Sequence, residues 1–287
     1  MEFLMTYGWS VLIVTAVIVI LFNMGIFNSA NFAPKAQPGN CKVLRTGGFT
    51  NLEGTCSGVP PQSVAMFNGI SGSILTGNLN GAPAITSSGG LVTLTGWAYS
   101  SDITTYRSLV TYGSTPPLIG LAYDDNCGSI PDVLSILYYL GGTYADYCLA
   151  PPITAGTWAF YAVTYNGVTG AAVTYEGAGG SLYSHTSTYS LGSNVIPANP
   201  PVSIGTGTGI TWFGVISNIQ VYNTTLDANQ IGLLYREGIG GAPIAPQSIV
   251  GWWPLNGNAN DYSGNNDNGA ATGITYTSSW TSGYTAP

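Results

Sequence analysis

Apolar residues are distributed in two different ways along the chain. Residues 3–27 are nearly all apolar and carry no charge. Their polar side chains are Thr6, Ser10, Thr15 and Asn23. As a helix, this stretch would be roughly 37 Å long, which is enough to cross a bilayer, and it lacks the basic start of a cleaved secretory signal. The pattern therefore predicts a long N-terminal α-helix that first anchors the chain in a membrane.

After residue 61 the pattern changes to short runs that are typical of β-strands. Residues 92–99, 158–165 and 213–222 are rich in β-branched and aromatic side chains, and Gly, Asn and Pro bound them. Many such strands favour an all-β jelly-roll sandwich. In the last of these runs we expect one face to hold Phe213, Val215, Ser217, Ile219 and Val221.

One short helix is expected within this β-rich part. Asp227 can cap its N-terminus, and Gln230 follows three residues later, which is the spacing of a capping box. Gly238 can end the helix. Its apolar face would consist of Ile231, Leu234 and Tyr235.

Composition sets the domain boundaries. Pro34 and Pro38 cannot continue a helix, and the small polar residues around them indicate a linker. The chain is therefore expected to comprise a hydrophobic helix at 1–27, a linker and disulfide collar at 28–60, a β-sandwich at 61–245 and a C-terminal segment at 246–287. The alternative for the collar is an ordinary loop or the first hairpin of the head.

Four cysteines allow three disulfide pairings. Short loops cost less entropy to close, which favours Cys41 with Cys56 and Cys127 with Cys148. Disulfides of this kind require an oxidising location outside the cell. Buried free thiols are the alternative, whereas a zinc site is disfavoured because the chain has a single histidine.

Charge is sparse and excludes one class of function. Only 6% of the residues are charged, against roughly 25% in ordinary soluble proteins. The net charge is −7, and the basic residues are scattered: Lys35, Lys42, Arg45, Arg107 and Arg236. Without a basic stripe the chain is not expected to bind nucleic acid. Few groups titrate, so we expect assemblies of this chain to survive acid.

The chain begins MEFLMTYGW, followed by SVLIV. Over about the first 25 residues this resembles the mature start of archaeal type IV pilin-like proteins, although their acidic residue is often fifth and here it is second. The resemblance implies a subunit of an extracellular filament whose partners are identical subunits. Five residues are then expected at assembly contacts: Glu2, Phe3, Gly8, Trp9 and Gly25. An ionised carboxylate between apolar helices needs a partner such as a neighbour's α-amino group, and glycines allow close helix approach.

Several segments of the β-rich part resemble laminin-G-like, concanavalin A-like jelly-roll domains. The matching pieces are MFNG at 66–69, LTGW at 94–97, GTWAFYAVTYNG at 156–167, FGVISNIQVYN at 213–223 and the residues from 226 to 237. Their order and spacing imply a head with this jelly-roll fold.

The C-terminal residues 250–266 look like the opening of such a domain, displaced to the other end of the chain. An apolar strand at 249–253 should not stay exposed, because an unpaired apolar edge invites association. We expect it to complete the sandwich of its own chain, as in a circular permutation. The alternative is insertion into a neighbouring subunit by strand addition.

Catalysis is not expected. Glycosidases with this fold use paired carboxylates, and the glutamates Glu2, Glu53, Glu176 and Glu237 are far apart in the sequence. The single histidine, His185, lies in a Ser/Thr-rich stretch and is expected to be an exposed loop residue.

Calcium is a weaker hypothesis, since many laminin-G-like domains bind it. Two clusters offer oxygen ligands: Asp124, Asp125 and Asn126, and Asn256, Asn260 and Asp261. Calcium takes six to eight oxygens, so each cluster would need further ligands. Solvated turns are the commoner explanation for such residues.

Two features of the sequence concern sugars. Exposed aromatic side chains beside Asn and Asp would suit glycan binding, although most aromatics are expected in the core. Asn223 starts an N-glycosylation sequence, Asn-Thr-Thr, between a predicted strand and the predicted helix.

Taken together, the two resemblances predict a structural subunit of an archaeal type IV pilus-like filament, inserted in the cytoplasmic membrane before assembly. The alternative is a membrane-anchored, lectin-like surface protein.

Overall fold

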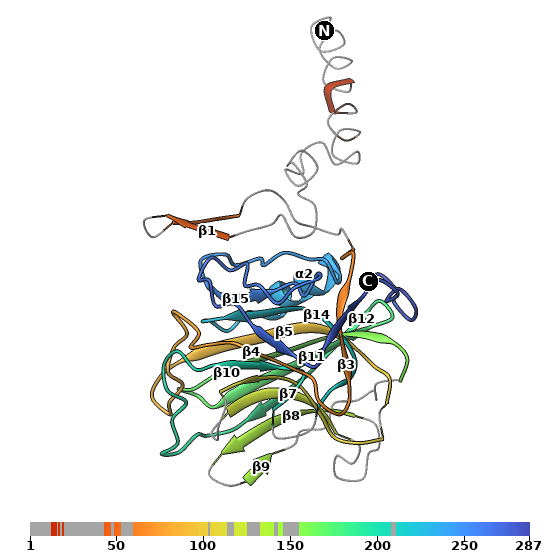
Figure 1. The fold of residues 1–287 in the computed structure, drawn as a ribbon. Coiled ribbons are helices and arrows are strands. Elements are labelled where there is room, and N and C mark those ends of the chain that lie inside the picture. The colour runs from red at the N-terminus through yellow and green to blue at the C-terminus, as the bar shows by residue number, and fades with distance from the viewer. Residues whose placement is uncertain are drawn as a thin grey trace, which may run out of the picture.

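A computed structural model gives the structure of the 287-residue chain. It describes residues 13–15, 17, 19, 43–46, 49–52, 60–102, 104–113, 118–124, 133–140, 143–145, 155–207 and 211–287. Figure 1 shows the described head as a layered β structure with one helix on top.

The expectation of a long N-terminal helix is wrong for the residues described. Helical backbone is described there only at residues 13–15, 17 and 19. No helix within the described ranges is long and apolar enough to cross a membrane. The side chains of Ile13, Val14, Val17 and Val19 are 47–58% exposed. β-Branched residues favour helices weakly, and helices gain most of their stability from packing, which these side chains do not have within the single chain.

The expected β-sandwich is present, and its described strands form two antiparallel sheets. The eight-stranded sheet has the order β12 (Ser181–Thr188), β11 (Ala171–Ala178), β10 (Trp158–Asn166), β5 (Leu91–Ser100), β14 (Phe213–Tyr222), β3 (Val64–Asn68) and β17 (Thr275–Thr277), with β15 (Ile249–Trp253) also paired to β14. The seven-stranded sheet has the order β16 (Ala270–Thr272), β4 (Ser73–Leu75), β13 (Val202–Ile204), β6 (Arg107–Tyr112), β7 (Leu118–Asp124), β8 (Val133–Leu140) and β9 (Thr143–Ala145). In the predicted collar, β1 (Val43–Thr46) and β2 (Phe49–Leu52) form a separate hairpin.

The main core lies between the two sheets. Leu94 and Val163 of the eight-stranded sheet and Leu109 and Ile204 of the seven-stranded sheet are at most 1% exposed within it. A second apolar layer lies on the outer face of the eight-stranded sheet, under helix α2 (Ala228–Glu237). Because both of its faces are covered, strand β10 is buried from its first to its eighth residue, which explains its almost wholly apolar sequence.

Helix α2 confirms the predicted cap. The Asp227 carboxylate accepts from the Gln230 N–H at 2.8 Å, and the Gln230 side chain accepts from the Asp227 N–H at 2.9 Å. Gly238 ends the helix with φ of 76°. The predicted apolar face is buried, and the Tyr235 ring stacks on Trp97 with centroids 5.9 Å apart.

The predicted common face of strand β14 is wrong. Val215 packs under α2, whereas Ile219 and Val221 face the core between the sheets. The register with β5 shifts between Ser217 and Gln220, and Asn218 there has φ of 53°. One irregular residue moves every later side chain to the opposite face of a strand.

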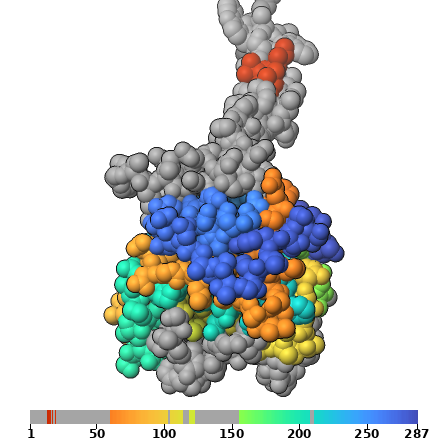
Figure 2. All heavy atoms as spheres, viewed as in Figure 1, coloured from red at the N-terminus to blue at the C-terminus, as the bar shows by residue number. Residues whose placement is uncertain are grey.

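The C-terminal segment lies within the head of its own chain. Strand β15 pairs with β14, β16 with β4 and β17 with β3, so the segment joins both sheets. Trp252 and Trp253 are 3% and 0% exposed. Figure 2 shows the C-terminal residues in dark blue lying against the first strands of the head in orange.

Candidate functional site

A pocket of about 490 Å³ opens on the outer face of the eight-stranded sheet. We call it the outer-face pocket. Its apolar floor contains Met66, Tyr99, Phe213 and Val215. Amide and hydroxyl groups surround this floor: Asn68, Ser101, Thr275, Thr277, Ser279 and Ser282.

Strand register produces the floor. Val215 of β14 lies opposite Tyr99 of β5 on one side and Met66 of β3 on the other, and Met66 lies opposite Thr275 of β17. These four side chains form a row across four adjacent strands. Phe213, two residues before Val215 at the start of β14, also lines the pocket and extends the floor toward the end of the strands.

The C-terminal tail forms one wall through Trp280, which is 5% exposed. Its ring packs edge-on against Trp158, with centroids 6.0 Å apart, and against Tyr284 at 5.6 Å. The Trp158 indole N–H donates to the Trp280 carbonyl at 2.8 Å. The Trp280 indole N–H donates to the Pro61 carbonyl at 3.0 Å. These contacts hold the wall rigidly against the sheet.

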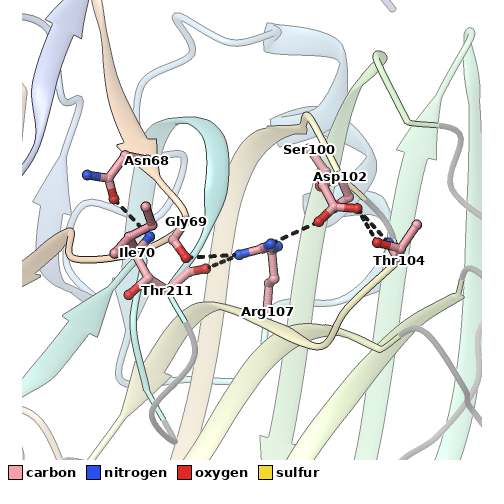
Figure 3. A network of polar contacts seen from close by, with 8 residues as sticks. All are labelled: Asn68, Gly69, Ile70, Ser100, Asp102, Thr104, Arg107 and Thr211. Atoms are coloured by element: carbon pink, nitrogen blue, oxygen red, sulfur yellow. Dashed lines mark hydrogen bonds and ion pairs between the residues drawn. The ribbon is translucent and has the colours of Figure 1, made fainter.

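Arg107 contacts the aromatic floor through Phe213 and forms a polar network with the neighbouring loops, which Figure 3 shows. Its guanidinium carbon lies 5.4 Å from the centre of the Phe213 ring. It donates to the Thr211 carbonyl at 2.8 Å, to the Gly69 carbonyl at 3.4 Å and to the Asp102 carboxylate at 2.9 Å. Arg107 is 9% exposed, so this cation is paired and nearly covered. It fixes the loops on both sides of Phe213.

Asp102 is held as an anion in the same network. Hydrogen bonds from the Thr104 hydroxyl and then from Arg107 lower the pKa of Asp102 to about 2. The Thr104 hydroxyl donates at 2.6 Å and the Thr104 N–H at 2.9 Å. Asp102 is therefore ionised throughout the physiological range of pH.

Asn68 projects from a tight turn at the edge of the pocket. Its Oδ1 accepts from the N–H groups of Ile70 and Ser71, both at 2.9 Å. Gly69 has φ of 75°, and a Cβ there would lie 2.9 Å from the Phe213 Cβ. Because Oδ1 is used within the turn, the Nδ2 amide is oriented outward as a donor, as Figure 3 shows.

Asp261, the predicted calcium ligand in the C-terminal segment, anchors a turn. Its Oδ1 accepts from the N–H groups of Trp252 (2.9 Å) and Ser263 (2.8 Å). Its Oδ2 accepts from the Ser263 hydroxyl at 2.8 Å and the Asp267 N–H at 3.0 Å. Its predicted neighbour Asn256 instead accepts from the Ser63 N–H at 2.9 Å. In the described part of the chain, no three His, Cys, Asp or Glu side chains gather to hold a metal ion.

Most other predicted site residues lie outside the described residues. These are the assembly residues Glu2, Phe3, Gly8, Trp9 and Gly25, the cysteines Cys41, Cys56, Cys127 and Cys148, residues Asp125 and Asn126, and the side chain of Asp124. Their roles stay predictions. Asn223 is exposed between β14 and α2, where a glycan could be attached. His185 is exposed as expected, but it lies in strand β12 rather than in a loop.

A buried carboxyl group lies in the interior of strand β11. Glu176 is 4% exposed, and its register partners are Tyr161 of β10 and Tyr183 of β12. Within the described part of the chain its Oε2 has no hydrogen-bond partner. Burial raises the pKa of Glu176 to about 7.

Sequence reasoning did not identify the outer-face pocket. Met66, Asn68 and Phe213 stood within segments that were used only to recognise the fold. The pocket combines residues from four strands and the C-terminal tail, so no local spacing could reveal it. The Asn-Gly pair at 68–69 was the one local signal, because it predicts a turn at the end of β3.

No protein-family model matches the chain, and no curated protein matches it. Solved structures do resemble it. A proposed carbohydrate binding protein of Bacteroides ovatus ATCC 8483 has a TM-score of 0.55 at 20% identity, over 80% of this chain and 66% of that one. A native heptameric SAP-like pentraxin of Limulus polyphemus has a TM-score of 0.53 at 16% identity, over 75% and 94%.

Domains LG4-5 of the mouse laminin alpha1 chain have a TM-score of 0.42 at 13% identity, over 61% of this chain and 44% of that one, which is too low to support an argument. This chain spans just under two thirds of the Bacteroides protein, at 66%. At such identities the likeness defines the fold alone. The head is a jelly-roll sandwich with the fold of the first two structures, which confirms the all-β sandwich expected for this part of the chain.

Proposed function

We propose that the head is a carbohydrate-binding module and that the outer-face pocket is its binding site. One observation carries this proposal: an aromatic and apolar floor is ringed by amide and hydroxyl groups in a pocket of about 490 Å³. Ligand pockets typically have volumes of about 300–1,000 Å³, mostly apolar walls and a few well-placed polar groups.

The chemistry of the lining fits a sugar. A pyranose ring has a C–H face that packs on an aromatic ring, and its hydroxyls pair with amides and hydroxyls. Phe213 is 38% exposed and its ring is fixed by Arg107, so the stacking surface is formed before ligand arrives. Preorganisation of this kind lowers the entropic cost of binding. The fold likeness to the Bacteroides protein supports the same proposal.

A glycan array probed with the full chain tests the proposal. The chain should be kept in a polyoxyethylene detergent, because the sugar headgroup of an alkyl glycoside would compete for the pocket. We expect the chain to bind a defined set of glycans. Phe213→Ala should weaken this binding at least about 10-fold, because the sugar loses its contact with the ring. Tyr183→Ala is the matched control, since Tyr183 is an aromatic residue of similar exposure (42%) on the distant edge strand β12. Equal loss in both variants, or no glycan bound by a folded chain, would count against the proposal.

We further propose that the chain is a subunit of a type IV pilus-like filament at the cell surface. The observation that favours this is the exposure of Ile13, Val14, Val17 and Val19 in helical backbone, since apolar side chains of this kind need a cover. Neighbouring copies could provide it, with the membrane covering them before assembly. Electron microscopy of sheared cell surfaces tests this proposal: filaments containing this chain support it, and a purely monomeric surface protein contradicts it.

A further inference from the structure

The outer-face pocket is uncharged, and this limits its ligand. Each of the described residues that line it is apolar, aromatic, hydroxyl-bearing or an amide. A carboxylate or sulfate that enters such a pocket loses water without gaining a counter-charge, which is costly. An ammonium group meets the same difficulty.

Arg107 does not supply the missing cation. Its terminal nitrogens are committed to Asp102, Thr211 and Gly69. The positive face of the guanidinium is also covered by the Phe213 ring. Because the ion pair with Asp102 neutralises it, an anion in the pocket would face an already compensated charge.

Asn68 gives the edge of the pocket a defined polarity. Its Oδ1 is occupied by the turn, so Nδ2 offers N–H donors to a ligand. The hydroxyls of Thr275 and Ser282 can donate or accept. A ligand that carries neutral acceptor and donor oxygens around an apolar ring meets all of these groups.

Resting on the proposed function, we infer that the outer-face pocket takes neutral sugars and discriminates against acidic ones. The ligand lays its apolar C–H face on Phe213 and Met66, and one of its ring substituents accepts a hydrogen bond from Asn68 Nδ2. A C6 carboxylate, as in a uronic acid, is rejected because no lining group compensates its charge.

Matched ligands and variants test this inference with the full chain in the same detergent. The best neutral glycan from the array is compared by calorimetry with the same glycan oxidised at C6 to the uronic acid. We expect the acid to bind at least about 10-fold more weakly, at both low and high salt. Asn68→Asp retains the turn acceptor and removes the outward donor, so it should weaken neutral binding about 3- to 10-fold without lowering the melting temperature.

Adding a cation should reduce the discrimination against the acid. Thr275 is an exposed lining residue, and Thr275→Lys should tighten binding of the acid at least about threefold relative to the neutral glycan. Thr272→Lys is the control, because Thr272 is also exposed, on strand β16 of the seven-stranded sheet, but does not line the pocket.

The outcomes separate this inference from the proposed function. If the acid binds as tightly as the neutral glycan or tighter, and Phe213→Ala abolishes both, the pocket binds carbohydrate but the inference about charge is wrong. If neutral glycans bind equally well to wild type, Phe213→Ala and Asn68→Asp, the ligand lies elsewhere and both fail. Binding of no glycan at all overturns the proposed function and the inference with it.

Discussion

Replacing Glu176 by glutamine should remove a large part of the pH dependence of the head's stability. In the folded chain, burial raises the pKa of this carboxyl from 4.5 to about 7. Between these values the folded state retains a proton that the unfolded state has lost. The protonated carboxyl therefore stabilises the folded chain fully below about pH 4.5. This contribution to the free energy of unfolding is lost as the pH rises from 4.5 through the folded pKa of about 7.

The size of the effect follows from the pKa difference. Each unit corresponds to about 1.4 kcal/mol, so the contribution of Glu176 over this range is at most about 3–4 kcal/mol. Glutamine has the same shape and no charge. Glu176→Gln should match wild type near pH 4.5 and be more stable than wild type near pH 8 by up to the same amount.

Urea unfolding of the full chain at several pH values between 4.5 and 8 measures this directly. Wild type should lose stability as the pH rises, and the Glu176→Gln profile should be nearly flat. Glu237→Gln, a change at the end of α2, should retain the wild-type slope. A wild-type chain that is more stable at pH 8 than at pH 4.5, or a Glu176→Gln variant that retains the slope, would refute the reasoning.

Three further changes probe other parts of the head. Asn218→Ala should lower the free energy of unfolding by about 2–4 kcal/mol. The Trp252 indole N–H donates to Asn218 Oδ1 at 2.8 Å and would lose this acceptor, and the Gly241 carbonyl would lose Asn218 Nδ2 as one of its donors. The control Asn199→Ala, at an exposed residue with the same φ of 53°, should cost only about 1 kcal/mol in the same urea titration. Asp227→Ala should cost about 1 kcal/mol through loss of the cap, seen as a lower melting temperature. The lowered pKa of Asp102 stabilises the head above about pH 4, and this contribution is lost as the pH falls toward 2. Asp102→Asn should therefore make the free energy of unfolding less dependent on pH between about 4 and 2.

Local features of the head could be predicted from sequence, because their physical causes are local. Asp227, Gln230 and Gly238 determine where α2 begins and ends through hydrogen bonds and backbone angles within a few residues. The strand runs likewise indicated a sandwich, because side-chain alternation and turn residues decide local structure.

Features that depend on distant contacts were predicted poorly. Asn218 adopts a left-handed conformation that joins it to Trp252 and Gly241, and this local shift exchanges the two faces of β14. The outer-face pocket depends on the pairing of Met66 with Val215 and Thr275, residues about 150 to 210 positions away. Such pairings follow from the topology of the whole sheet, so the sequence suggested a sugar-binding role without locating its site.

A structure of the full chain bound to its tightest neutral glycan tests the central claim most directly. A sugar ring should pack within about 4 Å of the Phe213 ring and of Met66, with one of its oxygens about 3 Å from Asn68 Nδ2. Glycan density on the seven-stranded sheet, with the outer-face pocket left to solvent, would contradict it.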